Sequence, residues 1–400
     1  QTYQSVCLST TEAMVRNVQE SWTLRARTAR RQSRAPDSTY VSYRRLNWDR
    51  PPSLYLVVME SYGTVVSGSG AANDAYSRLM GPLSDSLEAA GWRAATARSV
   101  APVFGGLSWL SVASILLGTP VGHQPTYEAM HPTLDRYPHL VATLERKGYA
   151  TATLQPPVRQ RPGLSVENLF GFDRTFYFSD LNYRGPTYGW GIVPDQYSLS
   201  VAHEEFVERT SGPFFLMFET VGSHVPLDWA PPPLVRDPEV LNQSRSAATA
   251  RRIQRGSAPP SLPETDASSQ TSRLLRHLGH TWRVLANYLR TQAPRNSLVV
   301  VVGDHQPYFA EGPPTTPVHV LSRDDALVQQ FLRNGFASGL RPPADPDTLS
   351  HAGLYPLLMR AITAQDPSTK ESPPRSLPPR RPDGVQRAAL FPPEEGGDKE

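Results

Sequence analysis

The sequence lacks features on which several classes of protein depend. Its single cysteine, Cys7, excludes an intrachain disulfide and any metal cluster built from cysteines. No run approaches the roughly 18 to 20 apolar residues that a membrane-spanning helix needs, and no signal peptide is visible. The net charge of +3 is too small to indicate a nucleic-acid partner. Because the chain starts at Gln1 rather than methionine, we expect a signal or membrane segment to precede it in the full-length protein.

Proline, in contrast, is abundant and unevenly spread. The 40 prolines among 400 residues are about twice the average usage, so we expect part of the chain to stay unfolded. Residues 1–50 are polar and arginine-rich and indicate a linker helix region, either solvated or leading in from a membrane anchor. Residues 51–365 form one predicted domain, interrupted at about 230–269 by a segment without periodicity that we expect to be a mobile insertion. Residues 366–400 have the composition of a disordered proline-rich tail.

Within the predicted domain, apolar runs alternate with helical stretches. This alternation predicts an α/β fold with a mostly parallel central sheet and helices on both faces. The clearest runs are Leu54–Met59, Phe214–Phe218 and Leu298–Val302. None of them alternates between apolar and polar residues, so each predicts a strand that is buried on both faces.

Each of these runs ends at residues with metal-binding or acid–base chemistry. They are Glu60 and Ser61, then Glu219, Thr220, Ser223 and His224, and finally Asp304 and His305. Ligands bind beyond the carboxyl ends of parallel strands, so we expect these side chains to converge. A carboxylate after a strand also serves as a helix cap or turn residue, but three such strand ends in one chain favour a site. Carboxylates with an imidazole suit Mn²⁺, Mg²⁺ or Zn²⁺ better than Ca²⁺.

The stretch APVFGGLSWLSVASILLGTPVG contains the candidate nucleophile. Gly105 and Gly106 permit a tight turn, and Ser108 then begins an apolar helical pattern that we expect to stop at Gly118. The start of a helix favours anions such as a phosphoryl group. Two alternatives stay open: Ser108 is only a helix N-cap, or the nearby Ser111 is the nucleophile.

Seven segments, taken in order, resemble one known family. They are LYLVVMESYG, GGLSWLSVASILLGTPVG, LVATLERKGYATATLQ, ENLFGFDRTFYF, YGWGIVPDQYSL, FFLMFETVGSHVPL and VVVVGDHQPYF. Together they look like the lipoteichoic acid synthase and phosphoglycerol transferase branch of the alkaline phosphatase/sulfatase superfamily. The resemblance covers residues 51–362, and its short metal motifs are specific jointly rather than singly.

The resemblance implies a role for individual residues. Glu60, Asp304 and His305 match the family's metal ligands. Ser108 matches the nucleophile, which also touches the metal, and His224 matches the histidine that contacts substrate or leaving group. The family would bring one divalent ion, with Mn²⁺ the first choice and Mg²⁺ or Zn²⁺ as alternatives. It also implies a covalent phospho-enzyme, a lipid-headgroup or phosphoester substrate, and an extracytoplasmic, membrane-anchored location.

The chain departs from the family's pattern in places. The family member compared most closely has threonine where this chain has Ser108. The sulfatase signature C/S-x-P-x-R fails here, because Leu110 and Val112 stand where proline and arginine are required. An unmodified hydroxyl favours phosphorus over sulfate esters. The family's substrate-contacting positions do not align cleanly, and their candidates here are Arg159, Arg161 and Trp190.

The sequence therefore predicts a metal-dependent phosphotransferase or phosphodiesterase that acts on phospholipid-headgroup or glycan-linked substrates of the cell envelope. A first alternative is a hydrolase that releases phosphate or sulfate from a soluble ester. A second alternative is a non-catalytic, sulfatase-like binding domain. The intact set of Glu60, Ser108, Asp304 and His305 argues against this second alternative.

Overall fold

A computed structural model describes the region that the sequence predicts to be folded. The residues described are 51–68, 70–136, 139–159, 168–188, 193–243, 269–342 and 348–363. The predicted linker helix region at 1–50 and the predicted tail at 366–400 lie outside them. The predicted insertion is described as far as residue 243, where it includes the short helix α7 (Glu239–Gln243) with Leu241 buried.

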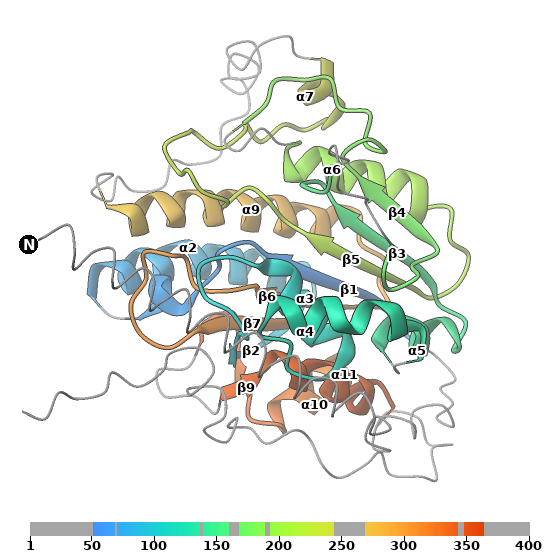
Figure 1. Cartoon of the computed structure of the whole chain (residues 1–400). Helices are drawn as coiled ribbons and strands as arrows, with labels where there is room; N and C mark the ends of the chain where they lie inside the picture. Colours follow the sequence, from blue (N-terminus) through green and yellow to red (C-terminus); the bar gives the residue numbers. More distant parts are fainter. Residues whose placement is uncertain are drawn as a thin grey trace, which may run out of the picture.

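Within the described residues, the fold is a nine-stranded sheet between two layers of helices (Figure 1). Its strands are β1 (Ser53–Met59), β2 (Arg93–Val100), β3 (Ala150–Gln155), β4 (Arg174–Tyr177), β5 (Phe214–Glu219), β6 (Ser297–Gly303), β7 (Thr315–Ser322), β8 (Ala337–Ser338) and β9 (Thr348–Ser350). The order is β4-β3-β5-β1-β6-β7-β2-β8, and β9 pairs with β2. The first five strands of this order, β4, β3, β5, β1 and β6, are parallel to one another, whereas β7 is antiparallel to its neighbours β6 and β2. The predicted mostly parallel α/β sheet is confirmed.

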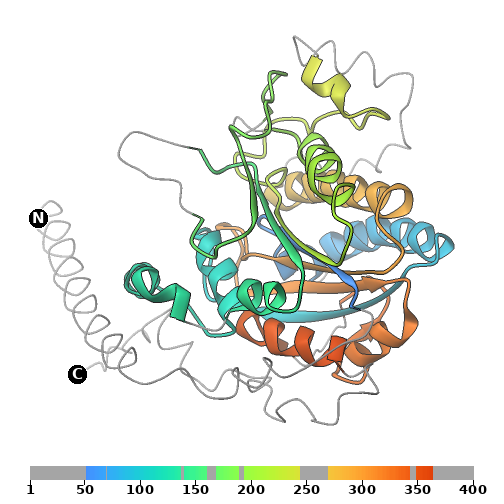
Figure 2. The same ribbon diagram turned by 90° about the vertical axis from the view of Figure 1, so that its right-hand side faces the viewer.

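Helices cover both faces of the sheet, as Figure 2 shows from the side. The main helices are α2 (Gly70–Ala89), α3 (Ser108–Leu117), α4 (Gln124–Met130), α5 (Leu140–Glu145), α6 (Asp195–Ala202), α9 (Gln270–Thr291), α10 (Asp325–Leu332) and α11 (Leu354–Thr363). A π-helical turn, His203–Val207, extends α6, and short 3-10 turns lie at Thr64–Ser67, His131–Arg136 and His351–Gly353. None of the helices described is both long and apolar enough to cross a membrane.

Strand β1 shows why its sequence is apolar throughout. Leu54, Leu56 and Val58 point into the core shared with α3, α5, α10 and α11. The residues between them point into the other core, shared with α2, α6 and α9. Each fully buried aliphatic side chain contributes about 1.5–3 kcal/mol, so both faces stabilise the central strands. The same burial fixes the strand register, because a slip by one residue would exchange the two faces.

Candidate active site

The register of the central strands brings the first two candidate ligands together. Met59 pairs with Gly303 at the carboxyl ends of β1 and β6, so Glu60 and Asp304 leave neighbouring strands at the same level. The Asp304 N–H donates to the Met59 carbonyl at 3.2 Å. In return, the Ser61 N–H donates to Asp304 Oδ1 at 2.8 Å. The second bond fixes the direction of the Asp304 carboxylate, and the Ser61 hydroxyl donates to Glu60 Oε1 at 2.7 Å.

Glu60, Asp304 and His305 form one buried cluster, whose ligand atoms lie within 4.8 Å of one another. His305 Nε2 is 3.3 Å from Asp304 Oδ2 and 3.7 Å from Glu60 Oε1. Burial raises the pKa of Asp304 well above its usual range, and the negative charge of Glu60 raises it further. Two carboxylates this close are unfavourable together unless a positive charge compensates them.

The tautomer of His305 fits the presence of a cation. Its Nδ1–H donates to the Gln306 carbonyl at 2.8 Å, so Nε2 is the ring nitrogen that faces the two carboxylates. This arrangement suits a metal ligand, whose other ring nitrogen is commonly held by a backbone carbonyl. The donor set therefore fits one divalent cation held by Glu60, Asp304 and His305.

Ser108 lies at the edge of this cluster. Its hydroxyl donates to Asp304 Oδ2 at 2.7 Å and lies 3.4 Å from His305 Nε2. The residue is the first of α3, and the N-cap is Leu107, in the left-handed conformation with φ 64° and ψ 41°. The alternative that Ser108 is the N-cap is therefore wrong. The helix ends before Gly118, as predicted, with that glycine also left-handed.

Ser111, the alternative nucleophile, has a different contact. Its hydroxyl donates to the backbone carbonyl of Asp304 at 2.6 Å, and the residue is fully buried. The two serines are almost one helical turn apart on α3, and they contact the side chain and the main chain of the same aspartate. Ser111 therefore holds the main chain of Asp304, whereas Ser108 faces the carboxylate of the cluster.

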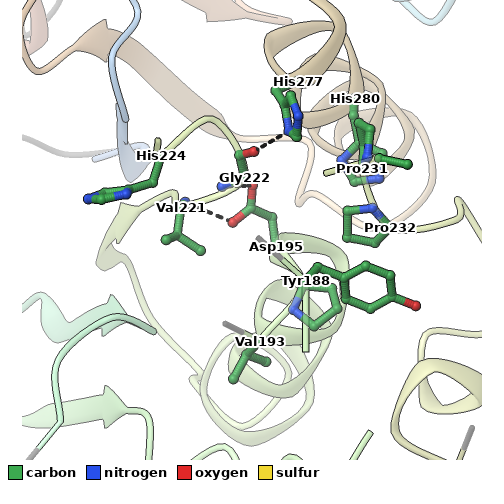
Figure 3. Close-up of a pocket in the computed structure, with 12 residues that line it drawn as sticks. Tyr188, Val193, Asp195, Val221, Gly222, His224, Pro231, Pro232, His277 and His280 are labelled. Atoms are coloured by element: carbon green, nitrogen blue, oxygen red, sulfur yellow. Dashed lines mark hydrogen bonds between the residues drawn. The ribbon is translucent and has the colours of Figure 1, made fainter. Parts of the chain in front are cut away.

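His224 lies on the loop that follows β5. Its backbone N–H donates to the Val221 carbonyl at 3.1 Å, which closes a tight turn. Its Nδ1–H donates to the Val225 carbonyl at 2.6 Å, so Nε2 is the basic nitrogen of the neutral ring. Figure 3 shows the ring pointing away from Tyr188 and His280, which lie on the other side of the loop.

Three residues at the end of β5 and just after it have contacts that the sequence did not assign. Thr220 Oγ1 accepts a hydrogen bond from the Glu60 N–H at 3.2 Å, and Ser223 Oγ donates to the Glu60 carbonyl at 2.5 Å. Glu219 accepts from Gln155 at 2.8 Å. Burial raises the pKa of Glu219 to about 7; the Gln155 hydrogen bond opposes this shift and the charge of Glu60 adds to it. Their only sequence signal was their position at the end of an apolar run.

The three candidates for substrate contact are placed only in part. The Arg159 guanidinium lies over the ring of Phe178, 3.8 Å from its centre, in the segment after the carboxyl end of β3. Arg161 and Trp190 lie outside the described residues. Contact of these three side chains with substrate stays a prediction.

The sheet carries the cluster beside a helix start at its carboxyl edge, and the family that the sequence matches makes the chain an enzyme of the alkaline phosphatase superfamily. A family model described as sulfatase matches residues 70–360, and the chain belongs to the sulfatase family.

Comparison with solved structures gives the same fold. The lipoteichoic acid synthase LtaP of Listeria monocytogenes is 13% identical with a TM-score of 0.50, over 82% of this chain and 78% of LtaP. An alkaline phosphatase superfamily protein of Vibrio parahaemolyticus is 12% identical with a TM-score of 0.50, over 82% of this chain and 76% of its own. A comparison with curated protein sequences found no match.

Proposed function

We propose that this chain is a metal-dependent phosphotransferase or phosphodiesterase in which Ser108 is the nucleophile. The hydrogen bond of 2.7 Å from Ser108 Oγ to Asp304 Oδ2 carries the proposal, because it places a hydroxyl against a buried carboxylate–imidazole cluster. A divalent cation held by Glu60, Asp304 and His305, with Mn²⁺ the first choice, would supply positive charge that lowers the pKa of a nearby hydroxyl and neutralises phosphoryl oxygens.

In the first half-reaction, Ser108 Oγ attacks phosphorus and passes its proton to Asp304 Oδ2, the oxygen that already accepts its hydrogen bond. The Oγ–P bond forms while the bond from phosphorus to the leaving oxygen breaks. The first N–H groups of α3 would favour the negative charge of phosphoryl oxygens bound beside Ser108. His224, protonated on Nε2, gives a proton to the leaving oxygen, which departs as an alcohol.

In the second half-reaction, an acceptor hydroxyl or water gives its proton to Nε2 of His224 and attacks phosphorus. The Oγ–P bond breaks, and Ser108 regains its proton from Asp304 Oδ2. His224 thus acts as acid in one half and as base in the other, as the symmetry of the two steps requires.

The proposed substrates are phospholipid-headgroup or glycan-linked phosphodiesters of the cell envelope. Phosphorus is favoured over sulfur because the unmodified Ser108 lacks the proline and arginine of the sulfatase signature. The proposed location is extracytoplasmic, beside the membrane that would hold such a substrate.

The direct test is turnover with added Mn²⁺ of p-nitrophenyl phosphate monoester, phosphodiester and sulfate. The proposal expects phosphoester turnover and a phosphoryl adduct on the Ser108 peptide after quenching during turnover. Turnover of the sulfate ester alone, or an adduct on another serine, would overturn it. Release of headgroup from phospholipid vesicles, compared with transfer to added glycerol, then separates hydrolysis from transfer.

A further inference from the structure

The loop after β5, residues 220–224, holds the main chain of a candidate ligand. Thr220 accepts from the Glu60 N–H and Ser223 donates to the Glu60 carbonyl, so both polar groups of that residue's backbone are bound. The Thr220 N–H also donates to the Val58 carbonyl at 2.9 Å. A displacement of this loop would therefore displace Glu60 as well as His224.

A buried carboxylate from α6 binds this loop on one side. Asp195 accepts from the Val221 N–H at 3.0 Å and the Gly222 N–H at 3.2 Å, and also from the Thr281 hydroxyl at 3.0 Å. Its exposed fraction is 2%. Burial raises the pKa of Asp195, and these three donors lower it. Burying a carboxylate costs free energy unless it is hydrogen-bonded. The three donors to Asp195 offset that cost and fix the carboxylate against the loop.

A histidine from α9 meets the same loop on the other side. His277 Nδ1 lies 2.8 Å from the Gly222 carbonyl, and its Nε2 lies 2.9 Å from the Trp229 carbonyl. The N–H and the carbonyl of Gly222 are thus both bound by side chains, as Figure 3 shows. The approach is close, because a Cβ on Gly222 would lie 2.7 Å from Asp195 Oδ2 and 2.8 Å from Thr281 Oγ1.

We propose that Asp195 is a positioning residue that sets, through loop 220–224, both the His224 ring and the Glu60 main chain. Asp195 holds the Val221 N–H, and the Val221 carbonyl accepts from the His224 N–H at 3.1 Å, so the turn that carries the imidazole is fixed at both ends. The part of this inference that concerns His224 rests on the proposed function. The expected effect of Asp195 on metal affinity, through Glu60, does not depend on the reaction that the enzyme catalyses.

The substitution Asp195→Asn tests this proposal with little change in size. Asp195 Oδ1 faces one N–H donor and Oδ2 faces two donors, so an amide nitrogen placed at either position meets an N–H group. The loop must then shift. Thr281→Val is the matched control, because it removes one hydrogen bond from the same carboxylate and leaves both loop hydrogen bonds in place.

Two readouts separate positioning from a loss of fold. Calorimetric titration with Mn²⁺ should show about 10-fold weaker binding in Asp195→Asn, the effect typical of residues that orient a ligand. The rate should fall about 10- to 100-fold with an alkyl phosphodiester, whose leaving oxygen needs a proton, but less with a p-nitrophenyl diester. Thr281→Val should stay within about threefold of wild type in both assays.

Unchanged Mn²⁺ affinity together with an equal loss for both leaving groups would overturn the proposal. If Asp195→Asn does not fold, as judged by circular dichroism, Gly222→Ala decides, because its Cβ displaces the loop while leaving the carboxylate intact. If the wild type turns over neither ester, the proposed function fails. The Mn²⁺ titrations then still show whether Asp195 positions Glu60 for metal binding.

Discussion

Ser108 Oγ donates to Asp304 Oδ2 at 2.7 Å, although 196 positions separate the two residues in the chain. The contact joins the start of α3 to the end of β6. It makes one carboxylate both a candidate metal ligand and the acceptor for the candidate nucleophile. A change at Ser108 should therefore affect reactivity more than folding.

Ser108→Ala should lower phosphodiester turnover by several orders of magnitude and abolish the phosphoryl adduct, because the attacking oxygen is lost. Ser108→Thr should keep measurable activity, since the oxygen is retained. Ser111→Ala is the matched control from the same helix. It should lower the free energy of unfolding by about 1–3 kcal/mol, because the buried Asp304 carbonyl loses its donor, and it should keep the adduct. Full activity in Ser108→Ala would remove Ser108 from the mechanism.

Much of the central sheet follows from the sequence because its strands have a distinctive composition. The runs Leu54–Met59 and Leu298–Val302 are apolar on both faces because helices cover both faces, and parallel pairing then carries their polar ends to one edge. Strand β2, Arg93–Val100, has no such run. It lies in the antiparallel part of the sheet, where the sequence gives little sign of pairing.

The supports of the site could not be predicted from the sequence. Ser223 binds Glu60 across 163 positions, and Asp195 binds Val221 across 26. Each is an ordinary polar residue whose role depends on the distance between backbone groups in the folded chain. Candidate ligands and nucleophiles can be recognised from their residue type and their position after a strand. The residues that hydrogen-bond to their main chain cannot.

Glu60→Gln should leave the protein at least as stable as the wild type without metal, and less stable than the wild type when Mn²⁺ is added. Without metal, it removes one of two buried negative charges and relieves Asp304, whose pKa is raised by burial and by Glu60. In a chelator we therefore expect the variant to melt at or above the wild-type temperature. Mn²⁺ at about 100 times its Kd should stabilise the wild type by about 2.7 kcal/mol and the variant much less. Thermal melts with and without Mn²⁺ check this; the same shift in both proteins would contradict it.

Leu107→Gly should raise the free energy of unfolding by about 1 kcal/mol. Leu107 has φ 64°, a left-handed conformation that is unfavourable for a bulky residue and easy for glycine. The side chain is substantially exposed, so its removal loses little packing. Turnover should fall, because a flexible residue before Ser108 holds the hydroxyl less firmly. Asn182→Gly, at φ 49°, is the control: urea unfolding should show a smaller gain, since asparagine tolerates this conformation, and turnover should not change.

His319→Gln should make the protein less sensitive to acid. His319 is fully buried on β7, with Nδ1 2.7 Å from the Thr96 hydroxyl and Nε2 2.8 Å from the Tyr62 hydroxyl. Burial lowers its pKa from 6.5 to about 3. The stability that this histidine contributes is therefore complete above pH 6.5 and is lost as the pH falls toward 3. In this range the histidine binds a proton in the unfolded chain but stays neutral in the folded protein.

That loss amounts to about 1.4 kcal/mol per pH unit for one histidine. At pH 7.5 the glutamine variant should be the less stable protein, since two buried hydroxyls lose a well-placed partner. Between pH 6 and pH 4 its stability should fall less steeply, and the gap between the two proteins should narrow. Urea unfolding in a chelator across this range measures the difference. The other buried histidines are the same in both proteins, so parallel pH profiles would mean that His319 does not control the acid response.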